Sequence, residues 1–292
     1  MNSLRFIVYA RSVRTSIILL ALMLPVAARI EVHGHRGARA ILPENSLPAF
    51  RYALEQGVDV LEMDLAVTKD EVVVVSHDAT MNPKLCEGPA GAERAIHKMT
   101  YAELRKWKCG VLPHADFPAQ KRLAVEVPRL EDVFKLAAKT KVHFNIETKI
   151  SPKTPDLAPT PERFAELVLA AVRKYKLEDR VILQSFDFRT LHAMKKLAPK
   201  MRLSALFPFD TGQRNVDYLE MAKASGAEIL SPHFSTVTPE KIAAAHRAGL
   251  TVVPWTPNTE ADWQKMIDAK ADAIISDDPA ALIAYLKSKG LR

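Results

Sequence analysis

The acidic residues that could hold a metal ion lie in two segments with the apolar pattern of strands. Glu62 and Asp64 are two positions apart within residues 60–67, and Glu147 closes residues 142–147. Side chains two apart on a strand point to the same face. The Glu62-x-Asp64 pair alone is more typical of a loop cap, or of a salt bridge to Lys149. With Glu147 on a neighbouring strand, three converging carboxylates predict a site for one divalent cation, Ca²⁺ or Mg²⁺.

Two histidines are expected to flank these carboxylates. His35 follows the segment 30–34 and His77 follows the segment 72–76. A turn at Lys69-Asp70 places His77 opposite Glu62 across a hairpin. Two imidazoles at one site allow one to act as a base and the other as an acid. His33, on the same strand as His35, is expected to pack or hydrogen-bond locally.

Two cations and two aromatic residues complete the predicted site. Arg36 and Lys149 adjoin the histidines and carboxylates in the sequence. Arginine offers paired donors to phosphate oxygens and lysine offers a point charge. Both could equally form salt bridges to the carboxylates, and the two roles are compatible. Phe186 and Trp255 are interpreted as walls of the site, with a place in the apolar core as the alternative.

The elements that must position these residues alternate between strands and helices. The predicted strands are residues 30–34, 60–67, 72–76, 142–147, 181–184, 202–207, 229–232, 251–255 and 273–276. Amphipathic helical stretches lie between most of them, for example one in which Leu130, Val133 and Phe134 recur at helical spacing. Asp187 and Thr238 are predicted N-caps. Such alternation predicts parallel strands joined by crossover helices.

The strand count predicts a closed barrel. Residues 68–71 are too few for a parallel crossover, which takes a dozen or more residues, so the strands on either side form an antiparallel hairpin. Eight parallel strands remain, and the length suits one (β/α)₈ TIM barrel of the α/β class. Chemistry in such barrels lies at the carboxyl ends of the strands. Residues 79–128 are predicted to be an inserted excursion over the barrel top, and the proline-rich residues 151–161 a stiff loop on the same face.

The N-terminal 28 residues have the pattern of a signal peptide. Three arginines precede the apolar run 17–24, and small residues follow at Ala27 and Ala28. The run is too short for a spanning helix, although an uncleaved N-terminal anchor is the alternative. Cleavage leaves residues 29–292 as a single domain with no stable membrane span, and lowers the net charge from +7 to +4. The sequence therefore predicts export to the periplasm or the medium, and its charge is a weak argument for nucleic-acid binding.

The chain has two cysteines, Cys86 and Cys109. In an oxidising compartment they are expected to form a disulfide, which the chain-entropy model credits with roughly 3 kcal/mol of stability. Two unpaired thiols are the alternative, and two cysteines alone make a poor zinc site.

At these residues the sequence resembles the glycerophosphodiester phosphodiesterase family, and its long insertion resembles the exported bacterial members. The matching elements occur in family order: His35-Arg36-Gly37-Ala38, Pro43-Glu44-Asn45-Ser46, Glu62-Met63-Asp64, Thr68-Lys69-Asp70, His77-Asp78, Glu147-Thr148-Lys149, Ser185-Phe186, Trp255-Thr256 and the run from Asp272 to Asp277. Departures include Glu71 in place of a glycine, and Pro257.

The resemblance implies hydrolysis of glycerophosphodiesters, such as glycerophosphocholine or glycerophosphoethanolamine, to glycerol 3-phosphate and an alcohol. It implies His35 and His77 as the acid–base pair. It implies Glu62, Asp64 and Glu147 as metal ligands, with Arg36 and Lys149 near the phosphate.

Three other functions share parts of this site. The first is a lysophospholipase D-like or other phosphodiesterase activity. The second is a non-catalytic binding protein for glycerophosphodiesters, against which the acid–base pair argues. The third is a barrel lyase or isomerase that uses the same metal. The expected partner is a small phosphodiester, and nucleic-acid binding has little support without a basic, aromatic-interleaved patch.

Overall fold

The computed structural model describes residues 29–207 and 217–292. The predicted signal peptide, residues 1–28, lies outside the described residues. Eight parallel strands form the barrel sheet: β1 Glu31–Gly34, β2 Val60–Val67, β6 His143–Thr148, β7 Val181–Ser185, β8 Arg202–Phe207, β9 Ile229–Pro232, β10 Thr251–Val252 and β11 Ala273–Ser276. The sheet runs in the order β10-β9-β8-β7-β6-β2-β1-β11. Backbone hydrogen bonds from Ile275 to Pro254 (3.0 Å) and from Asp272 to Val252 (3.1 Å) link its two ends.

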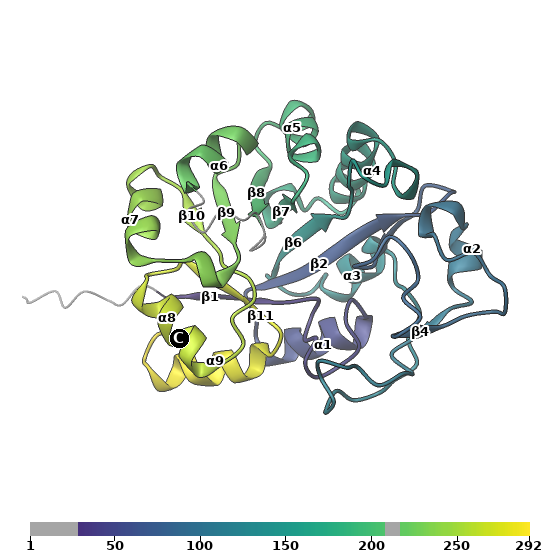
Figure 1. The fold of residues 1–292 in the computed structure, drawn as a ribbon, viewed down its shortest axis with the longest axis horizontal. Coiled ribbons are helices and arrows are strands. Elements are labelled where there is room, and N and C mark those ends of the chain that lie inside the picture. Colours follow the sequence, from purple (N-terminus) through teal and green to yellow (C-terminus); the bar gives the residue numbers. More distant parts are fainter. Residues whose placement is uncertain (1–28, 208–216) are drawn as a thin grey trace, which may run out of the picture.

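Helices surround the strands on the outside (Figure 1). They are α1 Leu47–Gln56, α3 Leu130–Leu136, α4 Pro161–Lys174, α5 Phe188–Leu197, α6 Tyr218–Ser225, α7 Pro239–Arg247, α8 Glu260–Asp268 and α9 Pro279–Ser288. Short 3-10 turns are η1 Ile96–Lys98, η2 Pro155–Leu157, η3 Glu178–Arg180 and η4 Phe234–Thr236. The predicted caps are confirmed, since Asp187 accepts from Arg189 N and Thr238 accepts from Lys241 N. One apolar core fills the space between sheet and helices.

The (β/α)₈ barrel predicted from the strand count is confirmed, and three of the predicted strands are shorter than expected. Residues 30–34 shorten to β1, residues 72–76 of the hairpin shorten to β3 Val73–Val75, and residues 251–255 shorten to β10. Pro254 has no N–H to donate to a ladder, so regular pairing of β10 stops before it. Trp255 makes only isolated bridges to His233 and Ile275.

The antiparallel hairpin of β2 and β3 is also confirmed, but its register differs from the prediction. Leu65 pairs with Val75 and Val67 pairs with Val73. The turn is centred on Asp70, because Glu71 adopts the left-handed φ of 61° and its N–H bonds to the Thr68 carbonyl at 3.0 Å. His77 is therefore not opposite Glu62, and it reaches the mouth from the chain that follows β3.

The excursion of residues 79–128 lies beside the barrel mouth (Figure 1). It contains α2 Tyr101–Leu104 and the short antiparallel pair β4 Cys86–Glu87 and β5 Lys108–Cys109. An apolar cluster joins it to the hairpin. Ala66 of β2 and Val74 of β3 pack there with residues of the excursion, which are Met81, Cys86, Ile96, Met99, Leu104, Trp107 and Val127. The excursion also touches the loop between β1 and α1, where a Cβ at Gly110 would lie 2.3 Å from Pro43 Cγ. Cys86 and Cys109 are joined by a disulfide.

Within residues 29–207 and 217–292, no helix is long and apolar enough to cross a membrane.

Candidate active site

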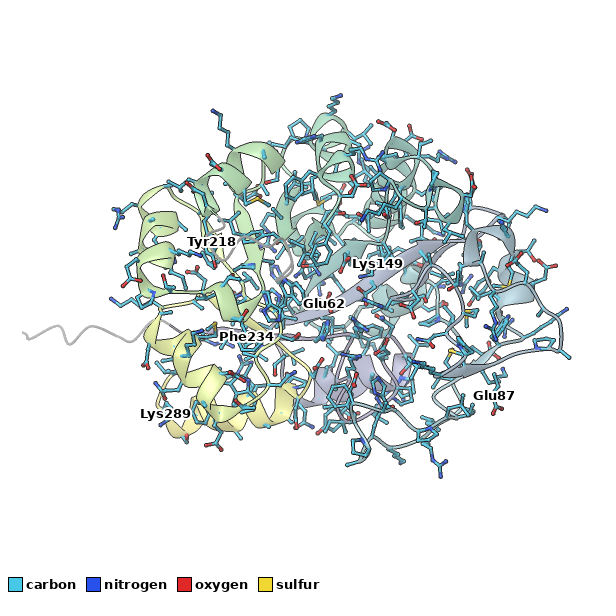
Figure 2. The ribbon with its side chains drawn as sticks, in the orientation of Figure 1. Glu62, Glu87, Lys149, Tyr218, Phe234 and Lys289 are labelled. Carbon is cyan, nitrogen blue, oxygen red and sulfur yellow. A yellow bond between two sulfur atoms is a disulfide. The ribbon has the colours of Figure 1, made fainter. Side chains whose placement is uncertain are left out.

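The three predicted carboxylates meet at one end of the barrel. Glu62 and Asp64 lie on β2, and the parallel register sets Asp64 beside Glu147 on β6. One oxygen from each residue lies within 4.8 Å of the others, and all three are buried. Glu62 lies near the centre of the molecule, inside the ring of helices (Figure 2). The spacing on β2 and the adjacency of β2 and β6 are enough to produce this cluster.

The charges in this cluster depend on burial and on nearby cations. Burial raises the pKa of Glu62 well above its usual range, and the neighbouring Asp64 raises it further. Burial also raises the pKa of Glu147. For Asp64 the effect of burial is outweighed by Lys149 and Arg36, so its pKa falls well below the usual range. Carboxylates that resist ionisation unless a cation joins them form a donor set that fits a hard divalent ion.

Arg36 and Lys149 bridge the carboxylates, as one of their two predicted roles requires. Lys149 Nζ lies 2.9 Å from Glu147 Oε1 and 3.4 Å from Asp64 Oδ1. Arg36 Nε lies 3.1 Å from Asp64 Oδ2, and its Nη1 donates to Glu44 Oε1 at 2.8 Å. Both residues also line the central cavity. The ion pairs therefore leave both cations next to the space that a substrate would enter.

His35 is held by a carboxylate from the last strand. Its Nδ1 lies 2.5 Å from Asp277 Oδ1, and Asn258 Nδ2 donates to Asp277 Oδ2 at 2.6 Å. Burial lowers the pKa of His35, and Asp277 opposes that shift. The other ring nitrogen, Nε2, lies 3.9 Å from Glu62 Oε2. With Nδ1 bonded to a carboxylate, Nε2 is the atom that can exchange a proton at the site.

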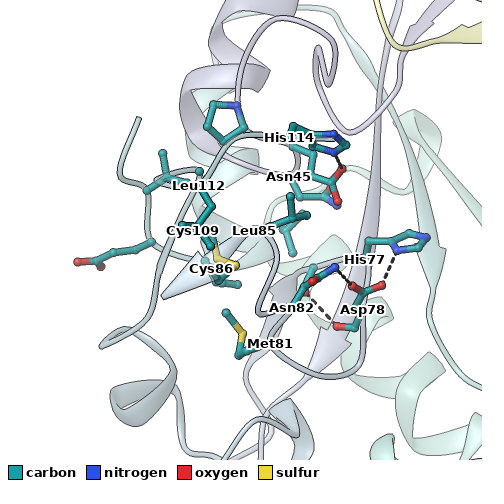
Figure 3. A pocket seen from close by; sticks show the side chains of 18 of the residues that line it. Asn45, His77, Asp78, Met81, Asn82, Leu85, Cys86, Cys109, Leu112 and His114 are labelled. Atoms are coloured by element: carbon teal, nitrogen blue, oxygen red, sulfur yellow. Dashed lines mark hydrogen bonds and ion pairs between the residues drawn. A yellow bond between two sulfur atoms is a disulfide. The ribbon is translucent and has the colours of Figure 1, made fainter. Parts of the chain in front are cut away.

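His77 has the same arrangement on the other side of the carboxylates. Its Nδ1 lies 2.8 Å from Asp78 Oδ1, and Asn82 Nδ2 donates to Asp78 Oδ2 at 2.9 Å (Figure 3). The side chain is 34% exposed, whereas that of His35 is 11% exposed. The two histidines therefore differ in solvent access, although each is bonded to an aspartate that is itself bonded to an asparagine.

A cavity of about 300 Å³ joins these groups. Its lining residues are His35, Arg36, Arg39, Glu62, His77, Glu147, Lys149, Gln184, Phe186, Leu206, Trp255, Thr256 and Ile275. Phe186 and Trp255 pack edge to face, with ring centroids 5.6 Å apart, and both face the cavity. The lining residues include none from 79–128, so the excursion does not roof this cavity. His33 lies outside it, buried, with Nδ1 3.5 Å from Asn145 Nδ2.

Comparison with known proteins shows the family to which this chain belongs. The model of the Glycerophosphoryl diester phosphodiesterase family matches residues 35–281. The chain belongs to this family. A glycerophosphodiester phosphodiesterase from Caldanaerobacter subterraneus subsp. tengcongensis is 31% identical over 259 residues, which cover 89% of this chain and 98% of the relative. The chain is therefore a phosphodiesterase of this family.

Solved structures of the phosphodiesterase family share the fold. A candidate glycerophosphoryl diester phosphodiesterase from Silicibacter pomeroyi has a TM-score of 0.83 at 32% identity, with coverage of 90% of this chain and 95% of that one. An Oleispira antarctica phosphodiesterase, solved in complex with the product sn-glycerol-3-phosphate, has a TM-score of 0.75 at 20% identity, with coverage of 89% and 97%. At 20% identity, the similarity to the Oleispira protein shows only that the two chains share a fold.

Four further residues of this phosphodiesterase support the site and were missed as functional residues by sequence reasoning. Gln184 Nε2 donates to Glu62 Oε1 at 2.7 Å, and Asn45 Nδ2 donates to Asp64 Oδ2 at 2.8 Å. Asp277 orients His35, and Glu44 binds Arg36. Gln184 and Asp277 carry a signal in the sequence, since each is a polar residue at or next to the carboxyl end of a barrel strand. Asn45 and Glu44 lie in a loop, and only the folded backbone brings them to the cluster.

Proposed function

We propose that the chain hydrolyses glycerophosphodiesters, such as glycerophosphocholine or glycerophosphoethanolamine, to glycerol 3-phosphate and an alcohol. The observation that carries the proposal is that His35 and His77, each bonded through Nδ1 to an aspartate, line one cavity with Glu62 and Glu147. A binding protein needs the charge of such a site but does not need two oriented proton carriers. The Caldanaerobacter relative, 31% identical and named a glycerophosphodiester phosphodiesterase, agrees with this substrate class.

Glu62, Asp64 and Glu147 would hold one divalent cation, Ca²⁺ or Mg²⁺. Their burial and their mutual distance of at most 4.8 Å support this assignment. When bound, such an ion neutralises charge that develops on a non-bridging phosphate oxygen. Gln184 and Asn45 fix two of the three carboxylates by hydrogen bonds, and partners of that kind orient metal ligands.

His35 and His77 divide the proton transfers between them. The Nε2 atom of one histidine accepts a proton from the nucleophile, and the other histidine donates a proton to the departing alcohol oxygen. The nucleophile is either water or the glycerol 2-hydroxyl, and the second route passes through a cyclic phosphate that water then opens. In both routes one water is consumed per molecule of phosphodiester hydrolysed. In the direct route each histidine regains its starting proton state after turnover, and in the cyclic route the two histidines exchange roles between the two steps.

Two cations and two aromatic residues among the other lining residues bind the substrate. Lys149 and Arg36 offer positive charge to the phosphate, which carries one negative charge at neutral pH. Phe186 and Trp255 present apolar ring surface to the carbon skeleton of the glycerol group. Phe186 is 39% exposed, so it can meet a ligand without displacing the core.

We also propose that the chain is exported to the periplasm or the medium. The signal-peptide pattern of residues 1–28 supports this, as does the Cys86–Cys109 disulfide, because disulfides persist mainly in oxidising compartments. Cell fractionation with N-terminal sequencing tests it. We expect a mature chain that begins at Arg29 in the exported fraction, and a full-length chain held in the membrane fraction would contradict this.

The first test of the activity is glycerol 3-phosphate release from glycerophosphocholine by the purified mature chain. The assay is run with EDTA, and again with Ca²⁺ or Mg²⁺ restored. We expect release that EDTA abolishes and one of the two ions restores. Folded protein that releases nothing with either ion would overturn the proposal. Cleavage of lysophosphatidylcholine in place of glycerophosphocholine would assign the site to the lysophospholipase D-like reaction.

A further inference from the structure

The turn that follows His77 is built around Asn82. The chain runs from β3 through His77 and Asp78 into the excursion, and Figure 3 shows Asn82 pointing back toward Asp78. Asn82 Nδ2 donates to Asp78 Oδ2 at 2.9 Å, while Asp78 Oδ1 holds His77 Nδ1 at 2.8 Å. Both carboxylate oxygens of Asp78 are therefore engaged. An aspartate fixed at both oxygens cannot rotate away from the imidazole that it orients.

Hydrogen bonds connect Asn82 in turn to a cysteine of the disulfide. The Asn82 carbonyl accepts hydrogen bonds from Leu85 N at 3.1 Å and from Cys86 N at 2.8 Å. Its side-chain oxygen accepts from Lys84 N at 3.0 Å, which leaves Nδ2 as the end that faces Asp78. Cys86 is tied to Cys109 by the disulfide. A continuous chain of bonds thus connects this cross-link to the ring of His77.

A second cavity is lined by His77, Asp78, Asn82 and the two cysteines. This cavity of about 60 Å³ lies between the hairpin end and the excursion. Asn82 itself is half-buried, and the hydrogen bonds of its turn hold it beside Asp78, with Cys86 tied to Cys109 next to it.

The other histidine offers an internal comparison. Asn258 Nδ2 donates to Asp277 Oδ2 at 2.6 Å, and its Oδ1 accepts from Asp277 N at 2.9 Å and from Ser276 Oγ at 3.0 Å. In that set His35 and Asp277 are buried, Asn258 is exposed, and no disulfide is adjacent. In the His77 set all three residues are half-buried, at a hairpin end from which the chain enters the excursion. The same side-chain arrangement therefore recurs in two backbone settings, and only the set at the hairpin end is next to a disulfide.

We propose that Asn82 is a positioning residue for His77, and that the Cys86–Cys109 disulfide serves the reaction by holding the Asn82 turn. The inference rests on the proposed acid–base role of His77. Through Asp78, Asn82 keeps the proton on Nδ1 and directs Nε2 toward the cavity. The excursion then contributes to the chemistry without lining the central cavity.

The first experiment compares Asn82→Ala with His77→Ala on glycerophosphocholine. Removing a residue that orients a reacting group through another side chain commonly lowers activity by about 10-fold or more. We expect Asn82→Ala to lower kcat by about 10-fold with KM changed less than twofold. The long-range ¹H–¹⁵N spectrum of the histidine rings should show that His77 loses its fixed Nδ1–H form, which a purely structural role would leave intact.

The second experiment removes the cross-link with the double variant Cys86→Ala/Cys109→Ala. We expect a fall in kcat similar to that of Asn82→Ala, and little further fall when the two changes are combined, because both act through one chain of contacts. Glu103→Ala is the matched control. It breaks the capping box of α2 in the same excursion but lies off this chain of contacts, so it should lower stability and leave kcat unchanged.

The outcomes separate this inference from the proposed function. An inactive wild-type chain, or a fully active His77→Ala variant, refutes the catalytic role of His77, and the ¹⁵N spectra still test whether Asn82 orients the ring. Wild-type kcat and an unchanged His77 spectrum in Asn82→Ala, beside an inactive His77→Ala, overturn the role of Asn82. If the double cysteine variant does not fold, the kcat and the His77 spectrum of Asn82→Ala decide whether Asn82 positions His77.

Discussion

His35 and Asp277 are 242 residues apart in the sequence, and their Nδ1 and Oδ1 atoms lie 2.5 Å apart. The contact exists because β1 and β11 are neighbours in the barrel, where Gly34 pairs with Ser276. The first and last strands among the described residues thus lead directly to His35, the proposed proton carrier, and to the carboxylate that orients it. Nothing in the local sequence of either strand specifies this partnership.

We expect Asp277→Asn to lower kcat by about 10²-fold or more, because the amide no longer enforces a proton on Nδ1 of His35. The assay is glycerol 3-phosphate release, with circular dichroism to check the fold. Asp278→Asn is the control, since Asp278 caps α9 by accepting from Ala281 N at 3.0 Å and asparagine caps equally well. Equal activity of the two variants would contradict the role of Asp277.

Replacing either histidine by alanine should cost at least about 10²-fold in kcat, because each supplies one of the two proton transfers. His246→Ala is the control, since His246 on α7 pairs with Asp272 just before β11, and neither residue lines the cavity. Full activity of His35→Ala or of His77→Ala would remove that residue from the mechanism.

Binding of the divalent cation should stabilise the folded chain through the three carboxylates. At a free ion concentration 100 times Kd, the free energy of unfolding should rise by about 2.7 kcal/mol, measured by denaturant titration with Ca²⁺ or Mg²⁺ and with EDTA. Glu147→Gln should abolish most of this rise, because it removes one of the three charged ligands. Glu131→Gln changes a half-buried glutamate on α3 that is paired with Lys174 and should keep the rise, so loss in both variants would refute the site.

The buried His33 should make stability depend on pH. Burial lowers its pKa to about 3 from an ordinary value of 6.5. Between these two values the unfolded chain binds one proton more than the folded chain, so the free energy of unfolding falls as the pH falls. The contribution is about 1.4 kcal/mol per pH unit, and it levels off below the folded pKa. Denaturant titrations from pH 7 to pH 4 should give His33→Leu a smaller slope by that amount, and parallel curves would contradict it.

Phe186→Ala should raise KM by about 10-fold with a smaller change in kcat, because an apolar wall binds substrate and transition state alike. Phe186 is 39% exposed, so stability should change little. Leu219→Ala is the control, since Leu219 is 43% exposed on α6 and is not among the residues that line the cavity. An unchanged KM would exclude Phe186 from substrate binding.

The strands, the hairpin and the carboxylate pair could be predicted because each depends on residues that are close together in the sequence. The apolar runs fix the strands to within a few residues, and residues 68–71 are too few for anything but a hairpin. The two-residue spacing of Glu62 and Asp64 forces both side chains to one face of β2. Once eight parallel strands are counted, the carboxyl ends of β1 and β6 must bring His35 and Glu147 to one mouth, where Glu62 of the long strand β2 lies just beyond its pairing with β1.

The remaining features were decided by the tertiary structure. The register of the hairpin depends on the left-handed conformation of Glu71, and a shift by one residue moves every pairing across the turn. Gln184 and Asn45 find their carboxylates only when strand β7 and the β1–α1 loop take their places around β2. The two aspartates illustrate the limit: Asp78 follows His77 directly, whereas Asp277 reaches His35 only through closure of the barrel. Sequence patterns encode periodicity over about ten residues, but a contact between the ends of the chain is set by the geometry of the closed sheet.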